Sequence, residues 1–154
     1  MDNRELLNNF YKAFSKANAE KMVSCYHKEI IFQDPAFGTL HGIQAKNMWR
    51  MLLSRNSDIM ISYQIVECDQ ATGKVDWVAH YAFGPNKRAV TNKVQGNFEF
   101  KDGKIIVHKD TFDLWKWSQQ AMGPIGYLLG WSSFLKKRIQ KKTKKLLKSF
   151  IEKQ

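Results

Sequence analysis

Four alternating runs of apolar and polar residues in the second half of the chain constrain its fold more than any other feature. They occupy residues 59–68, 75–83, 87–100 and 104–114, and each is rich in β-branched and aromatic residues. Short polar turns separate them, and the KDGK sequence at 101–104 is typical of a tight hairpin. No helical segment lies between the runs to carry a parallel crossover. The sequence therefore predicts four consecutive strands that pair as an antiparallel meander.

Helical periodicity dominates the first half of the chain. Apolar residues recur every three or four positions over residues 5–26, and Asn18, a good N-cap residue, divides this stretch into two helices. Residues 43–54 show the same spacing and predict a third helix, preceded by a short strand at 30–32. This order of elements indicates an α+β domain in which helices cover one face of a curved sheet.

The sequence IIFQDPAFGTLHG at residues 30–42 joins the short strand to the third helix. Pro35 supplies no backbone N–H, so the strand ends there or lies at an edge, and the residues that follow predict a turn-rich connection. Asp34 precedes this break and has two interpretations. It is a turn residue or solvated loop charge, or it lies at the mouth of an apolar cavity where desolvation raises its pKa toward the range of a general base.

Positive charge is concentrated near the C-terminal end. The 154-residue chain has a formal net charge of +11, and residues 136–153 contain nine Lys or Arg and one Glu. Ser132 or Ser133 is a suitable N-cap for a final helix at 134–152. The apolar residues of this helix form one narrow stripe: Phe134, Leu135, Ile139, Leu146, Leu147, Phe150 and Ile151.

Two roles are open for this basic helix. Its apolar stripe packs on the domain or on a second chain, or residues 134–152 make a weak contact with an anionic membrane surface. Lysines confined to one helix, without an arginine-rich or aromatic-interleaved reader, do not indicate nucleic-acid binding. The preceding segment, 115–130, is too apolar for a free loop and is expected to pack against other parts of the protein.

Other features bear on the compartment and on cofactors. Cys25 and Cys68 lie in apolar segments without CxxC spacing, which favours reduced core thiols. We find no signal-peptide pattern and no run of about 18 apolar residues that would span a membrane, so we expect a cytoplasmic protein. No Gly-rich phosphate loop, Ser nucleophile elbow or metal-ligand spacing is present, and the sequence therefore predicts no cofactor and no metal.

Three stretches together resemble the SnoaL-like superfamily, also called nuclear-transport-factor-2-like: IIFQDPAFGTLHG, GNFEFKDGKI and HKDTFDLW. The resemblance covers about residues 5–115, and the superfamily includes ketosteroid isomerases, limonene-epoxide hydrolases and polyketide cyclases. It implies a cone-shaped α+β barrel, in which a strongly bent antiparallel sheet wraps around N-terminal helices and encloses an apolar pocket. On this basis we expect a cone domain at 1–117, a C-terminal extension at 118–154, and a homodimer formed through the outer face of the sheet.

In this resemblance, Asp34 falls on the proton-shuttling base of the isomerases. Their tyrosine that donates to the developing oxyanion falls on Phe10, and the adjacent Tyr11 is expected to point about 100° away on the helix. Their second oxyanion donor falls on Gly96. The chain thus retains the base and replaces both stabilising donors.

The epoxide hydrolases resemble the chain along GKIIVHKDTFD, where Asp110 falls on one of their two catalytic aspartates. Their arginine and other aspartate fall on Ala79 and Tyr81, and their water-holding asparagine falls on Asp34. The resemblance and the period-two alternation of strand side chains together predict an acid–base cluster of Asp34, His108 and Asp110 inside the cone. The expected ligand-binding residues are aromatic: Phe10, Phe32, Trp49, Trp77, Tyr81 and Phe98.

Two functions of different class fit this predicted site. One is the binding of a small hydrophobic molecule in an aromatic-lined internal pocket, where the acids only orient it. The other is catalysis of isomerase, cyclase or hydrolase type on an apolar, carbonyl-bearing or cyclic substrate, with Asp34 as general acid or base. Alternatively, His108 is a structural residue of the sheet and Asp110 binds the backbone or a lysine. The remaining histidines are expected at the surface or at strand edges: His27, His41 and His80.

Overall fold

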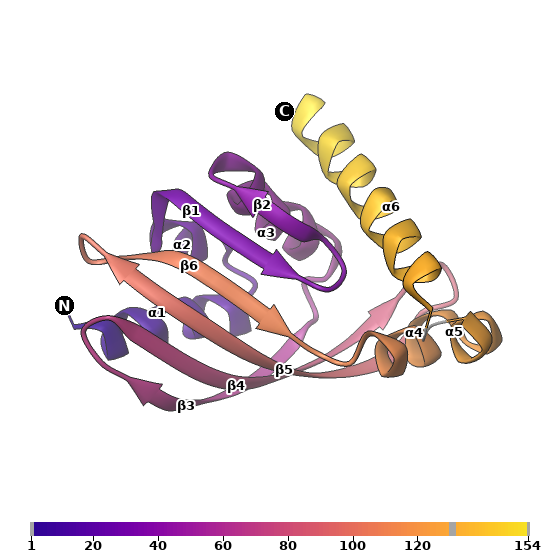
Figure 1. Ribbon diagram of the computed structural model, residues 1–154, viewed down its shortest axis with the longest axis horizontal. Helices are drawn as coiled ribbons and strands as arrows, with labels where there is room; N and C mark the ends of the chain where they lie inside the picture. The colour runs from indigo at the N-terminus through magenta and orange to yellow at the C-terminus, as the bar shows by residue number, and fades with distance from the viewer. Residues whose placement is uncertain (1, 130–131, 154) are drawn as a thin grey trace.

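The computed structural model of the chain describes residues 2–129 and 132–153. Its strands form one curved six-stranded sheet, and its helices lie around this sheet (Figure 1). In chain order the elements are α1 Asn3–Ser15, α2 Ala19–Ser24, β1 Tyr26–Asp34, β2 Gly38–His41, α3 Ile43–Arg55, β3 Met60–Cys68, β4 Thr72–Phe83, β5 Arg88–Lys101, β6 Lys104–Thr111, α4 Leu114–Met122, α5 Pro124–Leu129 and α6 Ser133–Glu152.

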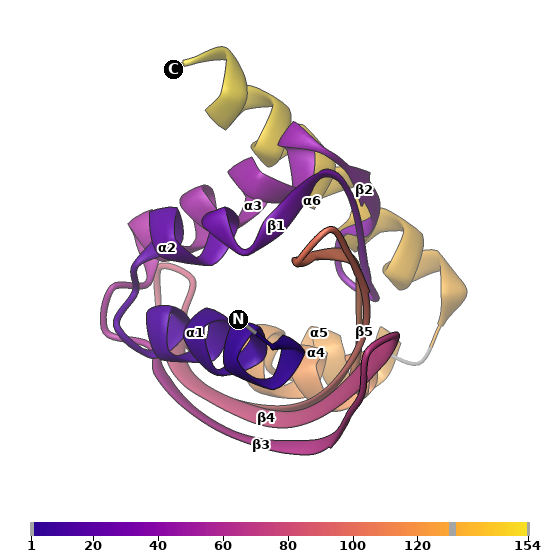
Figure 2. The same ribbon diagram turned by 90° about the vertical axis from the view of Figure 1, so that its left-hand side faces the viewer.

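The strands lie in the order β2-β1-β6-β5-β4-β3. Each of β3, β4 and β5 pairs antiparallel with the next strand in the chain, which confirms the predicted meander. β1 pairs antiparallel with β2 and parallel with β6, so the sheet is mixed and not antiparallel throughout. Figure 2 shows the long strands curving strongly around α1. The predicted α+β class, a bent sheet around N-terminal helices with a further C-terminal helix, is confirmed.

The first strand begins earlier than the sequence indicates. Periodicity predicts helix as far as residue 26, but α2 ends at Ser24 and β1 begins at Tyr26. Tyr26 is buried and pairs with Ile105 of β6, so long-range strand pairing overrides the helical spacing. The expected turn-rich connection likewise contains β2, which pairs residue by residue with the end of β1. Four residues are too few for alternation to reveal a strand.

The position of α1 inside the curved sheet decides how much of the helix is buried. Asp2 caps its first turn by accepting from Glu5 N at 2.7 Å. Asn18 accepts from Lys21 N at 3.1 Å and caps α2, which confirms the predicted division of the helical stretch. An ordinary surface helix buries a single stripe, whereas α1 is covered over a much wider arc. Its buried residues are Leu6, Leu7, Phe10, Tyr11, Ala13 and Phe14.

The apolar segment after the sheet forms α4 and α5, and its last residue, 130, lies outside the described residues. Gln120 fastens α4 to β5, because its Nε2 donates to Thr91 O at 3.0 Å and its Oε1 accepts from Thr91 N at 2.7 Å. The described part of the segment therefore packs on the domain, as its composition indicates. Position 117, the expected domain boundary, lies within α4, and that boundary stays a prediction.

The final helix, α6, packs across the turn that follows β1. Ser132 accepts from Leu135 N at 3.2 Å, which confirms it as the N-cap. Gln140 Nε2 donates to Pro35 O at 3.0 Å, and Thr143 Oγ1 donates to Ala36 O at 2.8 Å. The ribbon places α6 beside α3, β1 and β2 in both views (Figures 1 and 2).

Only part of the predicted apolar stripe of α6 faces the domain. Leu135 and Leu147 are buried, whereas Phe134 is 66% exposed and Leu146 is 36% exposed. The predicted stripe therefore does not face the domain along its whole width, because a residue next to a buried position on a helix lies about 100° around the axis from it. The inner side of α6 packs on the domain, which is one of the two roles expected for this helix.

Candidate functional site

A chain of hydrogen bonds crosses the interior and joins the predicted histidine and aspartate to β1, β4 and α3. Trp49 Nε1 donates to the Tyr26 hydroxyl at 2.8 Å, and that hydroxyl lies 2.7 Å from His108 Nδ1. His108 Nε2 lies 2.8 Å from Asp110 Oδ1, which also accepts from Trp77 Nε1 at 3.3 Å. The structure thus brings His108 and Asp110 together and connects them to three further side chains, none of which is exposed.

One arrangement of protons satisfies every contact in this chain. An indole N–H can only donate, so the Tyr26 oxygen accepts from Trp49 and directs its own proton to His108 Nδ1. His108 then carries its proton on Nε2, and this N–H donates a hydrogen bond to the Asp110 carboxylate. A buried polar group without a partner costs about 1–3 kcal/mol, so this full pairing explains how an aromatic interior accommodates a histidine and an aspartate.

Tyr11 is the exception to this pairing. Its side chain is fully buried, and its hydroxyl has no hydrogen-bond partner among the residues that the structure describes. A Cβ placed on Gly96 would lie 3.1 Å from the Tyr11 hydroxyl and 3.0 Å from Asp110 Oδ1, so both oxygens lie beside this glycine. Burial raises the pKa of Tyr11 well above its ordinary value, and the charge of Asp110 raises it further. The hydroxyl therefore keeps its proton and is a free donor.

Tyr11 is buried together with Phe10, although adjacent residues of a helix lie about 100° apart around its axis. A surface helix with one narrow apolar stripe buries few adjacent pairs of side chains. Because the sheet wraps around α1, both rings are buried and lie 5.2 Å apart between centroids. A tyrosine hydroxyl is therefore present in the interior, one residue from the position that the family resemblance indicates.

Asp34 lies at the end of β1, where it makes turn hydrogen bonds and is desolvated; its place at the mouth of a cavity stays a prediction. Its Oδ1 accepts from Ala36 N at 2.9 Å and from Phe37 N at 2.5 Å, which confirms the turn role. Burial raises the pKa of Asp34 to about 7 against the lowering effect of the Phe37 and Ala36 N–H groups, and the charge of Asp110 adds to the rise. A carboxyl with this pKa is present in both protonation states near neutral pH.

The predicted aromatic residues lie inside the cone and pack against one another. Tyr81 is half-buried, and its hydroxyl accepts from Trp117 Nε1 at 2.8 Å. His108 stacks between two other rings, with centroids 4.3 Å from Phe98 and 6.2 Å from Trp49. The described interior is thus an aromatic cluster, and an open pocket within it stays a prediction. The buried members of the predicted set are Phe10, Phe32, Trp49, Trp77 and Phe98.

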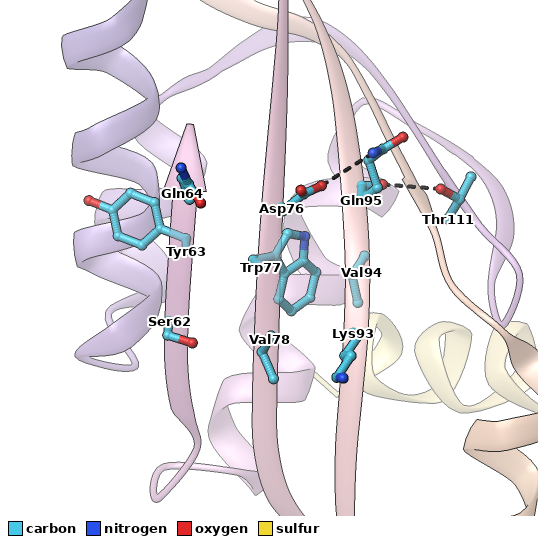
Figure 3. Close-up of a pocket in the computed structure, with 10 residues that line it drawn as sticks. All are labelled: Ser62, Tyr63, Gln64, Asp76, Trp77, Val78, Lys93, Val94, Gln95 and Thr111. Atoms are coloured by element: carbon cyan, nitrogen blue, oxygen red, sulfur yellow. Dashed lines mark hydrogen bonds between the residues drawn. The ribbon is translucent and has the colours of Figure 1, made fainter. Parts of the chain in front are cut away.

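A hollow of about 570 Å³ lies on the opposite, outer face of the sheet (Figure 3). Paired residues of neighbouring strands face the same way, so Gln64, Asp76, Gln95 and Thr111 share this outer face. Gln95 Nε2 donates to Asp76 Oδ1 at 3.2 Å, and the Thr111 hydroxyl donates to Gln95 O at 3.3 Å. Neither Asp34 nor any member of the interior hydrogen-bond chain except Trp77 lines this hollow.

The other histidines and the cysteines take different places. His41 and His80 are exposed, as expected. His27 is buried, so of its two expected places, the surface or a strand edge, the surface is wrong: its Nδ1 accepts from Glu29 N at 3.0 Å and its Nε2 lies 3.5 Å from Asp102. Both cysteines are free thiols: Cys25 and Cys68.

Sequence reasoning missed Tyr26 and Trp117 as members of the site. Tyr26 was counted in a helical stripe, and the irregular burial pattern of β1 offers no alternation that would have reassigned it. Trp117 lies beyond the resemblance, in α4, and only the packing of α4 on the sheet brings it to Tyr81. Within residues 2–129 and 132–153, no three His, Cys, Asp or Glu side chains are grouped to hold a metal ion, and no helix is long and apolar enough to cross a membrane.

Comparison with known proteins supports the architecture. Residues 7–108 match the sequence model of the SnoaL-like domain. An NTF2-like protein of unknown function from Burkholderia pseudomallei has a similar structure, with 16% identity, a TM-score of 0.67, and coverage of 78% of this chain and 97% of that chain. At such identity, similarity of structure shows the fold alone. No curated protein sequence matches the chain.

Two similar structures carry functional descriptions. A putative polyketide cyclase from Pseudomonas putida has 17% identity, a TM-score of 0.64, and coverage of 79% of this chain and 98% of that chain. An LEH-like epoxide hydrolase from M. tuberculosis has 17% identity, a TM-score of 0.59, and coverage of 80% of this chain and 92% of that chain. These descriptions apply to those proteins.

Proposed function

Because the chain belongs to the SnoaL-like domain family, we propose that it binds a small apolar molecule in its aromatic interior. The observation that carries this proposal is the Tyr11 hydroxyl, a buried donor without a partner among the described residues. A buried unpaired hydroxyl costs about 1–3 kcal/mol, which a hydrogen-bond acceptor on a ligand would recover. The ligand is accordingly apolar, with a carbonyl or similar oxygen directed at Tyr11 beside Gly96.

The aromatic cluster sets a condition on binding. Rings such as Phe10 and Phe98 are in contact, with centroids 6.4 Å apart, so a ligand has to displace side chains to reach the Tyr11 hydroxyl. Gly96 limits crowding at this point, since a Cβ there would come within 2.9 Å of the Phe98 ring. Aromatic faces and one polar anchor are the composition expected of a site for a small hydrophobic molecule.

Binding is tested with a matched pair of probes, 1-tetralone and tetralin, which differ by the ketone oxygen. Their effect is read from the indole N–H resonances of Trp49 and Trp77, both part of the interior chain. We expect the ketone to shift these resonances more strongly than the hydrocarbon, and Tyr11→Phe to weaken its binding roughly two- to tenfold. Tyr63→Phe is the control, because that hydroxyl donates to Asn8 instead. Absence of any shift at the interior tryptophans contradicts the proposal.

A second candidate function rests on the pKa of Asp34. Burial places it at about 7, so this carboxyl can remove and return a proton at neutral pH, and Asp110 and Tyr81 lie close enough to interact with its charge. We propose acid–base catalysis on a carbonyl-bearing or cyclic substrate as the alternative to binding alone. Removal of a proton next to the carbonyl would leave an enolate whose oxygen the Tyr11 hydroxyl can stabilise.

This alternative predicts exchange of the hydrogens next to the ketone of 1-tetralone for deuterium in heavy water. Asp34 takes the proton, and a deuteron from solvent returns to the same carbon. NMR measures the loss of the proton signal, and Asp34→Asn should abolish the protein-dependent rate. Exchange equal to that in buffer alone, with binding of the ketone demonstrated, would leave binding as the function.

A further inference from the structure

The outer side of α6 carries a continuous row of exposed residues that plays no part in packing. We define it as the outer stripe: Phe134, Lys137, Arg138, Lys141, Lys145 and Lys148. Spacings of three and four residues place these side chains on one side of the helix. The residues that hold α6 to the domain lie on another side and include Gln140 and Thr143, both neutral. The cations are therefore not needed to fix the helix in place.

No carboxylate among the described residues forms an ion pair with the outer stripe. Across the described ranges 2–129 and 132–153, the ion pairs are His27–Asp102, Arg50–Glu20 and His108–Asp110, and none includes a residue of α6. Residues 136–153 contain nine Lys or Arg against one Glu, so the helix repels itself electrostatically. A row of like charges without internal partners is complementary to a polyanionic surface.

We propose that the outer stripe of α6 docks the protein on an anionic phospholipid surface. The side chain that favours lipid is Phe134, which is 66% exposed in the first turn of the helix and shares its face with the lysines. An exposed aromatic ring among lysines matches a helix that lies in the lipid headgroup region, with the ring inserted and the cations on the phosphates.

The same residues are less suited to nucleic acid. Eight of the nine cations in 136–153 are lysines, which bind as point charges and lack the planar fork that arginine offers to phosphates and bases. A lipid surface needs only a high density of positive charge near anionic headgroups. Docking through the outer stripe would leave the inner side of α6 on the Pro35–Ala36 turn, so the arrangement around Asp34 is retained.

Co-sedimentation of the full chain with vesicles tests this proposal. We expect binding to phosphatidylcholine–phosphatidylserine vesicles and not to pure phosphatidylcholine vesicles, with affinity falling as salt is added. The double variant Lys141→Glu, Lys145→Glu should weaken binding at least about tenfold. The control, Lys93→Glu with Lys109→Glu, changes the net charge equally at exposed positions on the sheet and should have a much smaller effect.

Phe134→Ser keeps the test decisive if charge reversal lowers the stability of α6, because this exposed ring can be removed without disturbing the core. It should weaken vesicle binding several-fold. The proposal is overturned if the chain binds neutral and anionic vesicles equally or binds neither. It is also overturned if the control variant on the sheet loses as much vesicle binding as the α6 variant. So does a single-stranded oligonucleotide that binds through Lys141 and Lys145 while the anionic vesicles do not.

Discussion

The interior hydrogen-bond chain and the outer stripe of α6 hold polar side chains in opposite ways. Inside the cone, His108 and Asp110 are 1% and 3% exposed, and both ring nitrogens of His108 and Oδ1 of Asp110 have specific partners. On α6, Lys141 and Lys145 are exposed and have no ion-pair partner among the described residues. Burial makes each interior group costly unless it is paired, whereas water solvates a lysine at little cost. A single polar group in the interior therefore points to a specific role, whereas the lysines of α6 indicate a role only as a group.

This comparison predicts the largest effect for removal of an interior acceptor. Asp110→Ala leaves the Nε2 of His108 and the Nε1 of Trp77 without their acceptor in a buried place. We expect the free energy of unfolding to fall by about 3 kcal/mol, measured by urea denaturation. Asp76→Ala on the exposed face of β4 is the matched control and should change it by less than about 0.5 kcal/mol. Similar values for the two variants would remove the distinction between the regions.

The next largest effect is on the pH dependence of folding stability, through Asp34. Folding raises the pKa of this carboxyl from 3.8 to about 7, so the folded state binds the proton more tightly than the unfolded state. Its contribution to stability is present in full below about pH 4 and is lost as pH rises to about 7, by a few kcal/mol at most because Asp34 is only half-buried. Asp34→Asn should lack this loss and be more stable than the parent at pH 8. Parallel pH profiles of the two proteins in urea denaturation would refute the raised pKa.

Two tyrosine variants sharpen the contrast between a paired and an unpaired hydroxyl. Tyr63→Phe removes a donor to Asn8 Oδ1 at 3.0 Å and should lower the free energy of unfolding by about 1 kcal/mol. Tyr11→Phe removes a buried hydroxyl that has no described partner, so it should leave stability unchanged or raise it by up to about 1 kcal/mol. A loss of stability in Tyr11→Phe would show that the hydroxyl is paired in solution, for example by a water molecule.

The smallest effect is expected on the outer stripe. Lys141 and Lys145 are four residues apart on one helix, where like charges repel by a few tenths of a kcal/mol. Replacing both with Ala should raise the free energy of unfolding slightly or leave it unchanged, as measured by urea denaturation at low salt. A clear loss of stability would mean that these lysines contact the domain, which would weaken the case for a free docking surface.

The long strands and the helix caps were accessible from sequence because they depend on local patterns. Alternation over nine or more residues located β3, β4 and β5, and Asn18 and Ser132 were recognised as caps because capping is a contact with backbone only three residues away. β2 and the early start of β1 escaped detection. Both depend on pairing with strands distant in the chain, which leaves no periodic signal in such short stretches.

The residues of the candidate site also differ in how far the sequence could predict them. Asp34, His108 and Asp110 could be named from sequence, since strand alternation and the resemblance both place them toward the interior. The burial of Tyr11 was not accessible from sequence, because it follows from the sheet closing around α1. Trp117 reaches Tyr81 only through the packing of α4.

The sequence by itself determined the α+β class, the meander and the uneven distribution of charge, because each follows from residue type and short-range spacing. Tertiary structure alone decided that Tyr26 would link Trp49 to His108 and that Tyr11 would be buried without a described partner. It also decided which side of α6 faces solvent. These outcomes depend on the curvature of the sheet, which is set by all its strands together and by no single segment.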